Sequence, residues 1–195
     1  MNTPKHLGGH QGVTHIDKGA LSFMKELIDL VNANGEKIPL SMIDIGCGPM
    51  GQMREAKKLG FDVLGIDGDP SLPDSDLLIR HDFTKGAPEL PANEFGLAWS
   101  CEFVEHVEEQ YVDNFIDVFK KAHLVVMTAA PPESKGHHHV NCRNQDYWID
   151  KMESMGFSYG ETLTEELKKA STMKREFFKN TGMAFYNMNM KGVSL

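Results

Sequence analysis

Short apolar runs alternate with segments of helical periodicity along most of this 195-residue chain. The expected strands are residues 42–45, 61–66, 77–80, 96–100, 124–128, 157–159 and 183–190, and the expected helices are residues 18–32, 52–59, 107–121, 146–155 and 164–180. Parallel strands need a crossover between them, which is usually a helix. The alternation therefore predicts a doubly wound α/β fold, with a mostly parallel sheet of about seven strands and helices on both faces.

The chain is expected to form a single domain over residues 1–195, because its length suits one buried core and no linker or repeat divides it. No apolar run approaches the roughly 20 residues that a membrane helix needs. The first ten residues lack the apolar core of a signal peptide. Three scattered cysteines, Cys47, Cys101 and Cys142, fit a reducing compartment. These features predict a cytoplasmic protein without a membrane partner.

A glycine-rich turn, Gly46–Gly51, follows the first expected strand and matches the pattern G-x-G-x-x-G. Glycines there permit a tight turn and let the backbone approach a ligand closely. Asp67 ends the second expected strand, where a carboxylate can accept hydrogen bonds from two ribose hydroxyls. Both features indicate a Rossmann-like nucleoside site, and they fit a nicotinamide dinucleotide as well as S-adenosylmethionine.

Carboxylates at the strand ends separate these two cofactors. Asp44 stands two residues before Gly46, where a carboxylate would repel a pyrophosphate but attract the ammonium and sulfonium charges of S-adenosylmethionine. Asp82 and Phe83 follow the third strand, where they offer a carboxylate for the adenine amino group and a backbone N–H for a ring nitrogen. The pattern therefore favours S-adenosylmethionine.

Four segments resemble, in this order, the motifs of class I S-adenosylmethionine-dependent methyltransferases: Ile43–Pro49, Gly65–Asp67, His81–Phe83 and Glu102–Val107. The resemblance covers residues 40–130 and implies a cofactor-binding core there and an antiparallel last strand. We expect residues 1–33 to form a lid segment and a helix, and residues 131–195 to form an acceptor-side loop and the C-terminal strands. The expected cofactor contacts are Asp44, Gly46, Gly48, Asp67, Gly68, Asp82, Phe83 and Ser100.

A second set of polar residues follows the fourth and fifth strands. The spacing of Glu102, Glu105 and His106 would place them on one face of a helical turn. One of the three histidines at 137–139 could join them, and we assign His139. Carboxylate and imidazole ligands suit Mg²⁺, Mn²⁺ or Zn²⁺, which could lower the pKa of a substrate hydroxyl.

This Glu-x-x-Glu-His pattern is similar to that of the metal-dependent O-methyltransferases of ubiquinone biosynthesis and of small-RNA 3′ ends. Glu102, Glu105, His106 and His139 are therefore the predicted catalytic residues and metal ligands. Two alternatives stay open. His106 or a loop histidine could act as a general base without a metal, or the residues could be structural.

The expected function is transfer of a methyl group from S-adenosylmethionine to an oxygen of a small molecule or glycan. A net charge of −8 argues against a nucleic-acid partner. An RNA 2′-O-methyltransferase, a NAD-dependent oxidoreductase and a cofactor-binding module without turnover are the alternatives. Tyr147 and Lys151 match the Y-x-x-x-K pair of short-chain dehydrogenases, but without the companion glycine turn we interpret Tyr147 as a core anchor.

Two further segments have more than one interpretation. The Gly- and His-rich residues 8–17 could fold over the cofactor as a lid or form a floppy terminus. One basic cluster is interpreted as the solvent-facing side of a helix, with contact to an anionic acceptor as the alternative. It consists of Lys168, Lys169, Lys174, Arg175 and Lys179.

Overall fold

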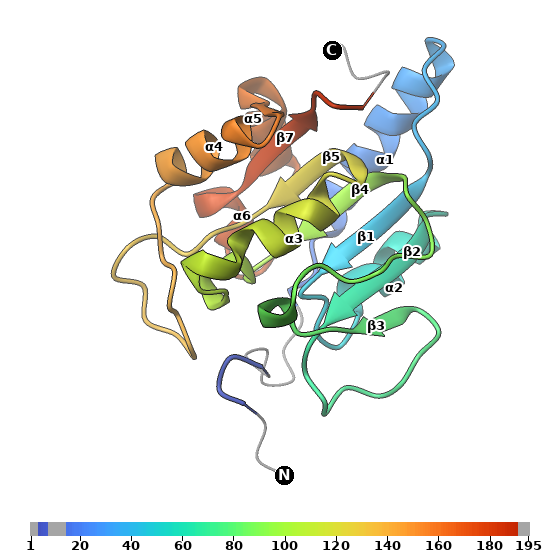
Figure 1. Cartoon of the computed structure of the whole chain (residues 1–195). Helices are drawn as coiled ribbons and strands as arrows, with labels where there is room; N and C mark the ends of the chain where they lie inside the picture. The colour runs from blue at the N-terminus through green and yellow to red at the C-terminus, as the bar shows by residue number, and fades with distance from the viewer. Residues whose placement is uncertain (1–3, 8–14, 191–195) are drawn as a thin grey trace.

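The structure is a computed structural model that describes residues 4–7 and 15–190 (Figure 1). The strands are β1 (Ser41–Ile45), β2 (Asp62–Asp67), β3 (Leu78–Arg80), β4 (Phe95–Ser100), β5 (Ala122–Met127), β6 (Phe157–Tyr159) and β7 (Met183–Asn187). The helices are α1 (Lys18–Ala33), α2 (Gly51–Lys58), α3 (Val112–Phe119), α4 (Gln145–Ser154), α5 (Glu161–Ala170) and α6 (Phe177–Thr181). The strands form one seven-stranded sheet in the order β3-β2-β1-β4-β5-β7-β6.

The sheet is parallel except at β7, which is antiparallel to both β5 and β6. The predicted fold, including the antiparallel last strand, is therefore confirmed. The chain moves outward from β1 to β3, returns to place β4 beside β1, and then moves outward in the other direction. Ligands of such sheets bind beyond the carboxyl ends of the strands where the order reverses, which here is between β1 and β4.

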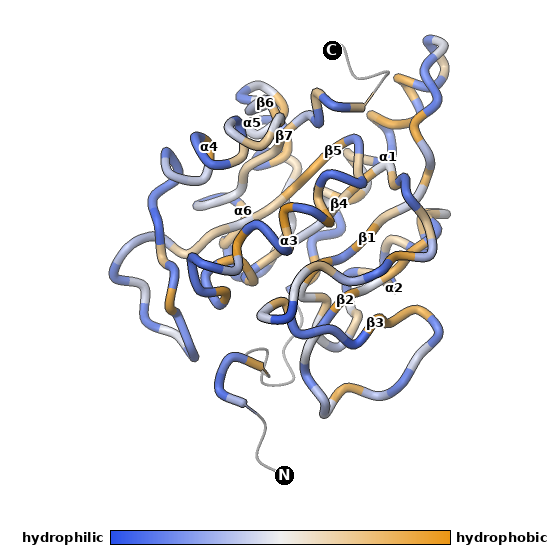
Figure 2. The backbone as a smooth tube through the Cα atoms, in the orientation of Figure 1, coloured by the Kyte–Doolittle hydropathy of each residue, from blue (hydrophilic) through white to orange (hydrophobic). Residues whose placement is uncertain are grey.

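Alternate residues of the central strands face two separate apolar cores. Ile43 and Ile45 of β1 pack against α3 and α4, whereas Met42 packs against α1 and α2. Figure 2 shows apolar positions concentrated along the sheet and hydrophilic positions along the loop that joins β5 to α4. Burying an apolar side chain of this size contributes roughly 1.5–3 kcal/mol. Asp44 lies between Ile43 and Ile45 in an otherwise apolar strand, so its burial opposes folding.

The helix predicted over residues 164–180 is wrong, because the structure has two helices, α5 and α6, separated by residues 171–176. The Ser171 hydroxyl donates to the Asp17 carboxylate, and the Thr172 N–H donates to Asp17 Oδ1 at 2.9 Å. Asp17 also caps α1 by accepting the Ala20 N–H at 3.0 Å. These long-range bonds replace helical ones and fasten residues 171–176 to the start of α1.

The helix predicted over residues 107–121 begins only at Val112. Val104–His106 and Glu109–Tyr111 form separate 3₁₀ turns, and Glu108 between them is extended with ψ of 145°. The segment that follows β4 is therefore a series of tight turns, which changes how its acidic side chains are placed.

In the described part of the chain, none of the helices combines the length and the apolarity that crossing a membrane requires. Cys47, Cys101 and Cys142 are all free thiols, as their scattered positions predict.

Candidate functional site

A cavity of about 560 Å³ lies beyond the carboxyl ends of β1, β2 and β4. This volume is within the range of small-molecule sites, roughly 300–1,000 Å³. The predicted cofactor contacts that line it are Asp44, Gly46, Gly48, Asp67, Gly68, Asp82 and Phe83. The predicted acceptor-side residues that line it are Glu102, His106 and His139.

The glycine-rich turn after β1 has no space for side chains at its first position. Gly46 has a φ of 75°, and a Cβ there would lie 2.5 Å from the Phe103 ring. The Gly46 N–H donates to the Ile66 carbonyl at 2.9 Å, which joins the turn to β2. The turn therefore presents bare backbone to the cavity, as the sequence pattern predicts.

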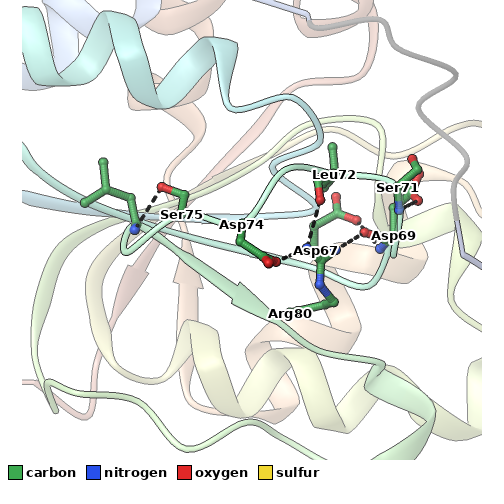
Figure 3. Close-up of polar contacts among 8 residues, drawn as sticks. Asp67, Asp69, Ser71, Leu72, Asp74, Ser75 and Arg80 are labelled. Atoms are coloured by element: carbon green, nitrogen blue, oxygen red, sulfur yellow. Dashed lines mark hydrogen bonds and ion pairs between the residues drawn. The ribbon is translucent and has the colours of Figure 1, made fainter.

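Asp67 is held in one orientation by the two loops beside it. Its Oδ2 accepts the Gly48 N–H at 2.8 Å, and its Oδ1 accepts the Asp69 N–H at 2.8 Å. Figure 3 shows the loop after β2 folding back on itself, with the Arg80 guanidinium donating to the Leu72 carbonyl at 2.8 Å. Each carboxylate oxygen has a second lone pair, so the fixed Asp67 can still accept hydrogen bonds from a ligand.

Asp44 is a buried carboxylate that lines the cavity, and its residue is only 3% exposed. Burial, reinforced by the charge of Asp67, raises the pKa of Asp44 to about 8. Among the described residues, no donor forms a hydrogen bond with its side chain. A buried carboxylate without a donor or cation is costly, which makes Asp44 receptive to a cationic ligand.

Asp82 is already bonded within the protein. Its Oδ1 accepts the Thr84 N–H at 3.0 Å and the Thr84 hydroxyl at 2.8 Å, and its Oδ2 lies 3.2 Å from His6 Nε2. Burial raises the pKa of Asp82, but the hydrogen bonds from Thr84 and His6 outweigh it and hold the pKa below its ordinary value. Its neighbour Phe83 packs into the core, with its ring centre 5.6 Å from that of Phe103.

Ser100 does not line the cavity, although it ends β4 as expected. Its hydroxyl donates to the Ile45 carbonyl at 3.1 Å and its residue is 1% exposed. This hydrogen bond ties β4 to β1. The prediction that Ser100 contacts the cofactor therefore lacks structural support.

Residues 4–7 lie near the carboxyl ends of the strands (Figure 1), and His6 and Leu7 line the cavity. His6 meets Asp82, and Leu7 lies so close to Gly68 that a Cβ there would be 2.4 Å from Leu7 Cδ2. The Lys5 carbonyl lies 3.0 Å from His137 Nε2. Residues 8–14, most of the predicted lid, lie outside the described residues. The contacts that join Asp82 and Gly68 to His137 are made by residues 5–7, which precede the predicted lid, and we call these contacts the bridge.

Glu105, His106 and His139 form a compact cluster on the other side of the cavity. One potential ligand atom from each lies within 4.8 Å of the other two. Glu105 is fully buried, and neither of its carboxylate oxygens has a hydrogen-bond partner of ordinary geometry among the described residues. His106 Nδ1 is buried without a partner in the same part of the chain. Of the three loop histidines, His139 is the one that joins this cluster.

The burial of this cluster controls its charge. Burial, followed by the charge of Glu102, raises the pKa of Glu105 to about 8, although the nearby N–H groups of Glu105 and Ala130 lower it in part. Burial, followed by His139, lowers the pKa of His106 to about 4. At neutral pH Glu105 is therefore largely protonated and His106 neutral unless a cation joins them.

Glu102 is outside the three-residue cluster, although its charge still acts on Glu105, and this corrects the prediction of a shared helical face. Its backbone is left-handed, with a φ of 55°, and it precedes the 3₁₀ turn that holds Glu105 and His106. Its Oε1 accepts the Thr128 hydroxyl at 3.0 Å, and its N–H donates to the same hydroxyl oxygen at 2.8 Å. Glu102 lines the cavity but is not in the three-residue cluster.

Several cavity residues were not predicted as site residues from the sequence. The Phe103 side chain packs against Gly46. Its position directly after Glu102, a predicted site residue, was the signal that could have identified it. Arg175 was noted only as part of a basic cluster, and nothing in the local pattern separates it from Lys174. The other cavity residues that were not predicted as site residues include His15, Gln52, Trp99, Lys135 and Phe177.

The residues that suggested a dehydrogenase lie elsewhere. The Tyr147 hydroxyl donates to Glu109, and Lys151 Nζ lies 2.6 Å from Asp113 Oδ1. Neither Tyr147 nor Lys151 lines the cavity. Trp148, which follows Tyr147, is fully buried and is an anchor of α4.

No family model matches the chain, and no curated protein matches it. The plantazolicin methyltransferase BpumL, bound to a triazolic desmethylPZN analog and S-adenosylhomocysteine, is similar over 89% of this chain and 86% of its own, with a TM-score of 0.56 and 13% identity. An S-adenosylmethionine-dependent methyltransferase from Mesorhizobium loti is 16% identical, with 85% and 99% of the two chains covered and a TM-score of 0.52. The chain shares their fold.

A phosphoethanolamine N-methyltransferase from Haemonchus contortus, bound to phosphomonomethylethanolamine and S-adenosylhomocysteine, is also similar in fold. It is 13% identical, with 85% of this chain and 52% of that chain covered and a TM-score of 0.51. These neighbours differ in the acceptor named for them, so the fold alone does not identify an acceptor.

Proposed function

We propose that this protein is an S-adenosylmethionine-dependent methyltransferase. The observation that carries the proposal is Asp44, a buried carboxylate that lines the cavity with its pKa raised to about 8. A neighbouring ammonium or sulfonium would stabilise its charged form, whereas a pyrophosphate would oppose it. Two solved structures of the same fold hold S-adenosylhomocysteine, which supports the same cofactor here.

The residues around the cavity fit this cofactor by their chemistry. Asp44 would bind the ammonium group, and Asp67 would bind the ribose hydroxyls. Gly46 would lie near the methionine moiety and Gly48 beside the cofactor, and a side chain at Gly46 would overlap Phe103. Asp82 would accept a hydrogen bond from the adenine amino group. His6 already contacts Oδ2 of Asp82, so it would have to share that oxygen with adenine or move away from it. When bound, the cofactor supplies an electrophilic methyl group, and the protein positions the acceptor in front of it.

We propose that the acceptor atom is a hydroxyl oxygen and that a divalent cation assists its deprotonation. A base with a pKa of about 4, as for His106, is neutral at pH 7 but weak. A cation held by Glu105, His106 and His139 would instead lower the pKa of a bound hydroxyl. The weakness of His106 as a base therefore favours the metal over His106 acting as an unassisted general base.

The cluster fits a divalent cation in three respects. Glu105 has a buried carboxylate without a hydrogen-bond partner among the described residues, which a cation would satisfy. His139 Nδ1 lies 3.3 Å from the Ser134 carbonyl, which leaves Nε2 for the metal. Three protein ligands would leave positions open for substrate oxygens. Glu102, the fourth predicted ligand, is bonded to Thr128 instead.

A small molecule, or a short glycan of similar size, is the proposed acceptor class. The cavity volume of about 560 Å³ has to hold the cofactor as well as the reacting part of the acceptor. The net charge of −8 disfavours an extended RNA, because RNA binding needs a basic surface along the backbone.

Calorimetric binding tests the cofactor assignment directly. We expect the protein to bind S-adenosylhomocysteine and not NAD, and we expect Asp44→Asn to weaken that binding by about tenfold or more. Asp62→Asn is the matched control, because Asp62 is exposed at the start of β2, at the end of the strand that is away from the cavity. Binding of NAD, or equal affinities of Asp44→Asn and the unchanged protein, would contradict the proposal.

Metal removal tests the acceptor-side assignment. We expect EDTA to abolish methyl transfer into small-molecule fractions and Mn²⁺ or Zn²⁺ to restore it. Glu105→Gln should lose Mn²⁺ binding, whereas Glu108→Gln should keep it, since Glu108 lines the cavity outside the cluster. Full activity after EDTA treatment would remove the metal from the proposal and leave the cofactor assignment intact.

We also propose that the N-terminal part of residues 1–33 acts as a lid. The support is the bridge made by residues 5–7, which joins Asp82 and Gly68 on the cofactor side to His137 on the acceptor side. A segment that contacts both sides at once can enclose the ligands and exclude water during transfer.

A further inference from the structure

Two of the side chains that line the cavity are cationic, Arg175 and Lys135. Other basic residues near the C-terminus are paired, because Lys168, Lys169 and Lys179 each form an ion pair with a glutamate three residues earlier. Neither Arg175 nor Lys135 has an ion-pair partner within the described ranges 4–7 and 15–190. Both charges are therefore available to an anionic ligand.

Arg175 forms one wall of the cavity with two aromatic neighbours. The His15 ring packs edge-on against Phe177 with the ring centres 4.8 Å apart. Burial lowers the pKa of His15, and the charge of Arg175 lowers it further, so His15 is neutral and Arg175 is the charged group here. We call Arg175, His15 and Phe177 the α6 wall. Asp17 holds this wall in place through its bonds to residues 171–172.

The α6 wall adjoins the end of β1. Asp44 is the register partner of Trp99 in the parallel pair of β1 and β4. Trp99 lines the cavity and stacks on Phe178 of α6, with 5.8 Å between the ring centres and 14° between the planes. Helix α6, which follows Arg175, therefore lies beside β4, and β4 is the neighbour of the strand β1 that carries Asp44.

Lys135 lies on the opposite, acceptor side. Its neighbour Gly136 is so close to His139 that a Cβ there would lie 2.1 Å from His139 Nε2. The two cationic side chains of the cavity therefore serve different regions: Arg175 accompanies Asp44, and Lys135 accompanies the cluster of Glu105, His106 and His139.

We propose that Arg175 binds the carboxylate of the cofactor's amino-acid moiety, an inference that rests on the proposed function. The ammonium and carboxylate of an α-amino acid share one carbon atom, so a site that binds the ammonium at Asp44 must also accommodate the carboxylate nearby. Without a cation, that carboxylate would face the charges of Asp44 and Asp67. A guanidinium can bind it through two parallel hydrogen bonds.

Decarboxylated S-adenosylhomocysteine provides the test, because it keeps the ammonium and lacks only the carboxylate. We would measure the affinity of the full-length protein and of Arg175→Gln for both compounds by calorimetry. We expect Arg175→Gln to bind S-adenosylhomocysteine about tenfold more weakly and to bind the decarboxylated compound as well as the unchanged protein does. Arg175→Lys should be intermediate, and Lys135→Gln, the matched control, should bind like the unchanged protein.

The possible failures are distinct. Equal loss of affinity for both compounds in Arg175→Gln would show that the α6 wall has only a structural role and would overturn the inference. Unchanged affinity for both would overturn it too, and a raised KM for the acceptor in that variant would assign Arg175 to an anionic acceptor instead. An unchanged protein that binds neither compound would refute the proposed function itself. Circular-dichroism melting verifies that each variant is folded.

Discussion

The two ends of the cavity satisfy their polar groups in different ways. At the β2–β3 end, Asp67 and Asp82 have both carboxylate oxygens bonded to donors of the protein. At the β4–β5 end, Glu105 and His106 are buried with atoms that have no partner among the described residues. A prebonded site is organised before its ligand arrives, whereas unpartnered buried groups are stabilised only when a ligand completes them. Ligand affinity at the β2–β3 end should therefore depend on the shape of the preformed site. Ligand binding at the β4–β5 end should instead raise the stability of the protein.

The largest effect is expected for Gly46→Ala, at the organised end. The new Cβ would combine the strain of a φ of 75° with a clash, because it would lie only 2.5 Å from the Phe103 ring. We expect affinity for S-adenosylhomocysteine to fall by about a hundredfold or more and the protein to lose roughly 1–3 kcal/mol of stability. Calorimetry and thermal melting measure both changes.

Gly35→Ala is the matched control for this variant. Gly35 has a φ of 106°, but no atom lies within 4 Å of the position of a Cβ there. It should lose about 1 kcal/mol of stability through strain alone and keep its affinity. Equal binding by the Gly46→Ala and Gly35→Ala variants would show that the turn after β1 does not approach the cofactor.

The next effect concerns the unpartnered end and its dependence on pH. The pKa of Glu105 is raised from 4.5 to about 8, so the folded state holds a proton that the unfolded state releases. Its contribution to stability is complete below pH 4.5 and is lost as pH rises toward 8. We expect Glu105→Gln to lose that part of the slope and to be more stable at pH 8 by on the order of a few kcal/mol.

Thermal melting between pH 5 and pH 8.5 measures this difference. Asp44 contributes a slope of the same sign, since its pKa is raised from 3.8 to about 8, so the variant should flatten the profile only in part. Mn²⁺ should stabilise the unchanged protein at pH 8 and leave Glu105→Gln unaffected. If the dependence of stability on pH were the same in Glu105→Gln and in the unchanged protein, the claim that the Glu105 carboxyl group is buried without a partner would be refuted.

The same contrast explains which parts of the site could be predicted from the sequence. The organised end depends on local signals: a glycine spacing after one strand and a carboxylate at the end of the next. Gly46, Asp67 and the unpartnered Asp44 beside them, all predicted from such local signals, line the cavity. Strand and helix positions in the sheet core followed from apolar periodicity for the same reason.

The rest depended on contacts that no local pattern contains. The positive φ of Glu102 keeps it out of the cluster that holds Glu105, whereas a helical turn would have placed both on one face. The bond between Ser171 and Asp17 spans most of the chain, yet it ends α5 and positions Arg175. Ser100 was expected at the cofactor because it ends β4, but its hydroxyl turns toward the Ile45 carbonyl.

A smaller effect is expected for Gly136→Ala, which perturbs the unpartnered end without removing a ligand. The new Cβ would overlap His139 Nε2 at 2.1 Å and turn the imidazole out of the cluster. We expect Mn²⁺ affinity to fall by about tenfold, with affinity for S-adenosylhomocysteine unchanged. Gly86→Ala is the control: a Cβ there would meet no atom within 4 Å, so its φ of 101° should cost stability and leave both affinities unchanged. A joint loss of both affinities would mean that the two ends of the cavity are not independent.

The smallest effect is expected where the two ends are bridged, at His6. His6→Ala removes the contact with Asp82 but leaves the Lys5 carbonyl free to meet His137. A partly exposed pair of this kind is worth about 0.2–1 kcal/mol, so dissociation of S-adenosylhomocysteine should accelerate by about two- to fivefold. Lys5→Ala is the matched control: Lys5 meets His137 through its carbonyl, and its side chain forms no hydrogen bond or ion pair with the described residues, so dissociation should not change. Stopped-flow measurement resolves the two variants, and slower dissociation from His6→Ala would mean that His6 competes with adenine for Asp82 instead of covering it.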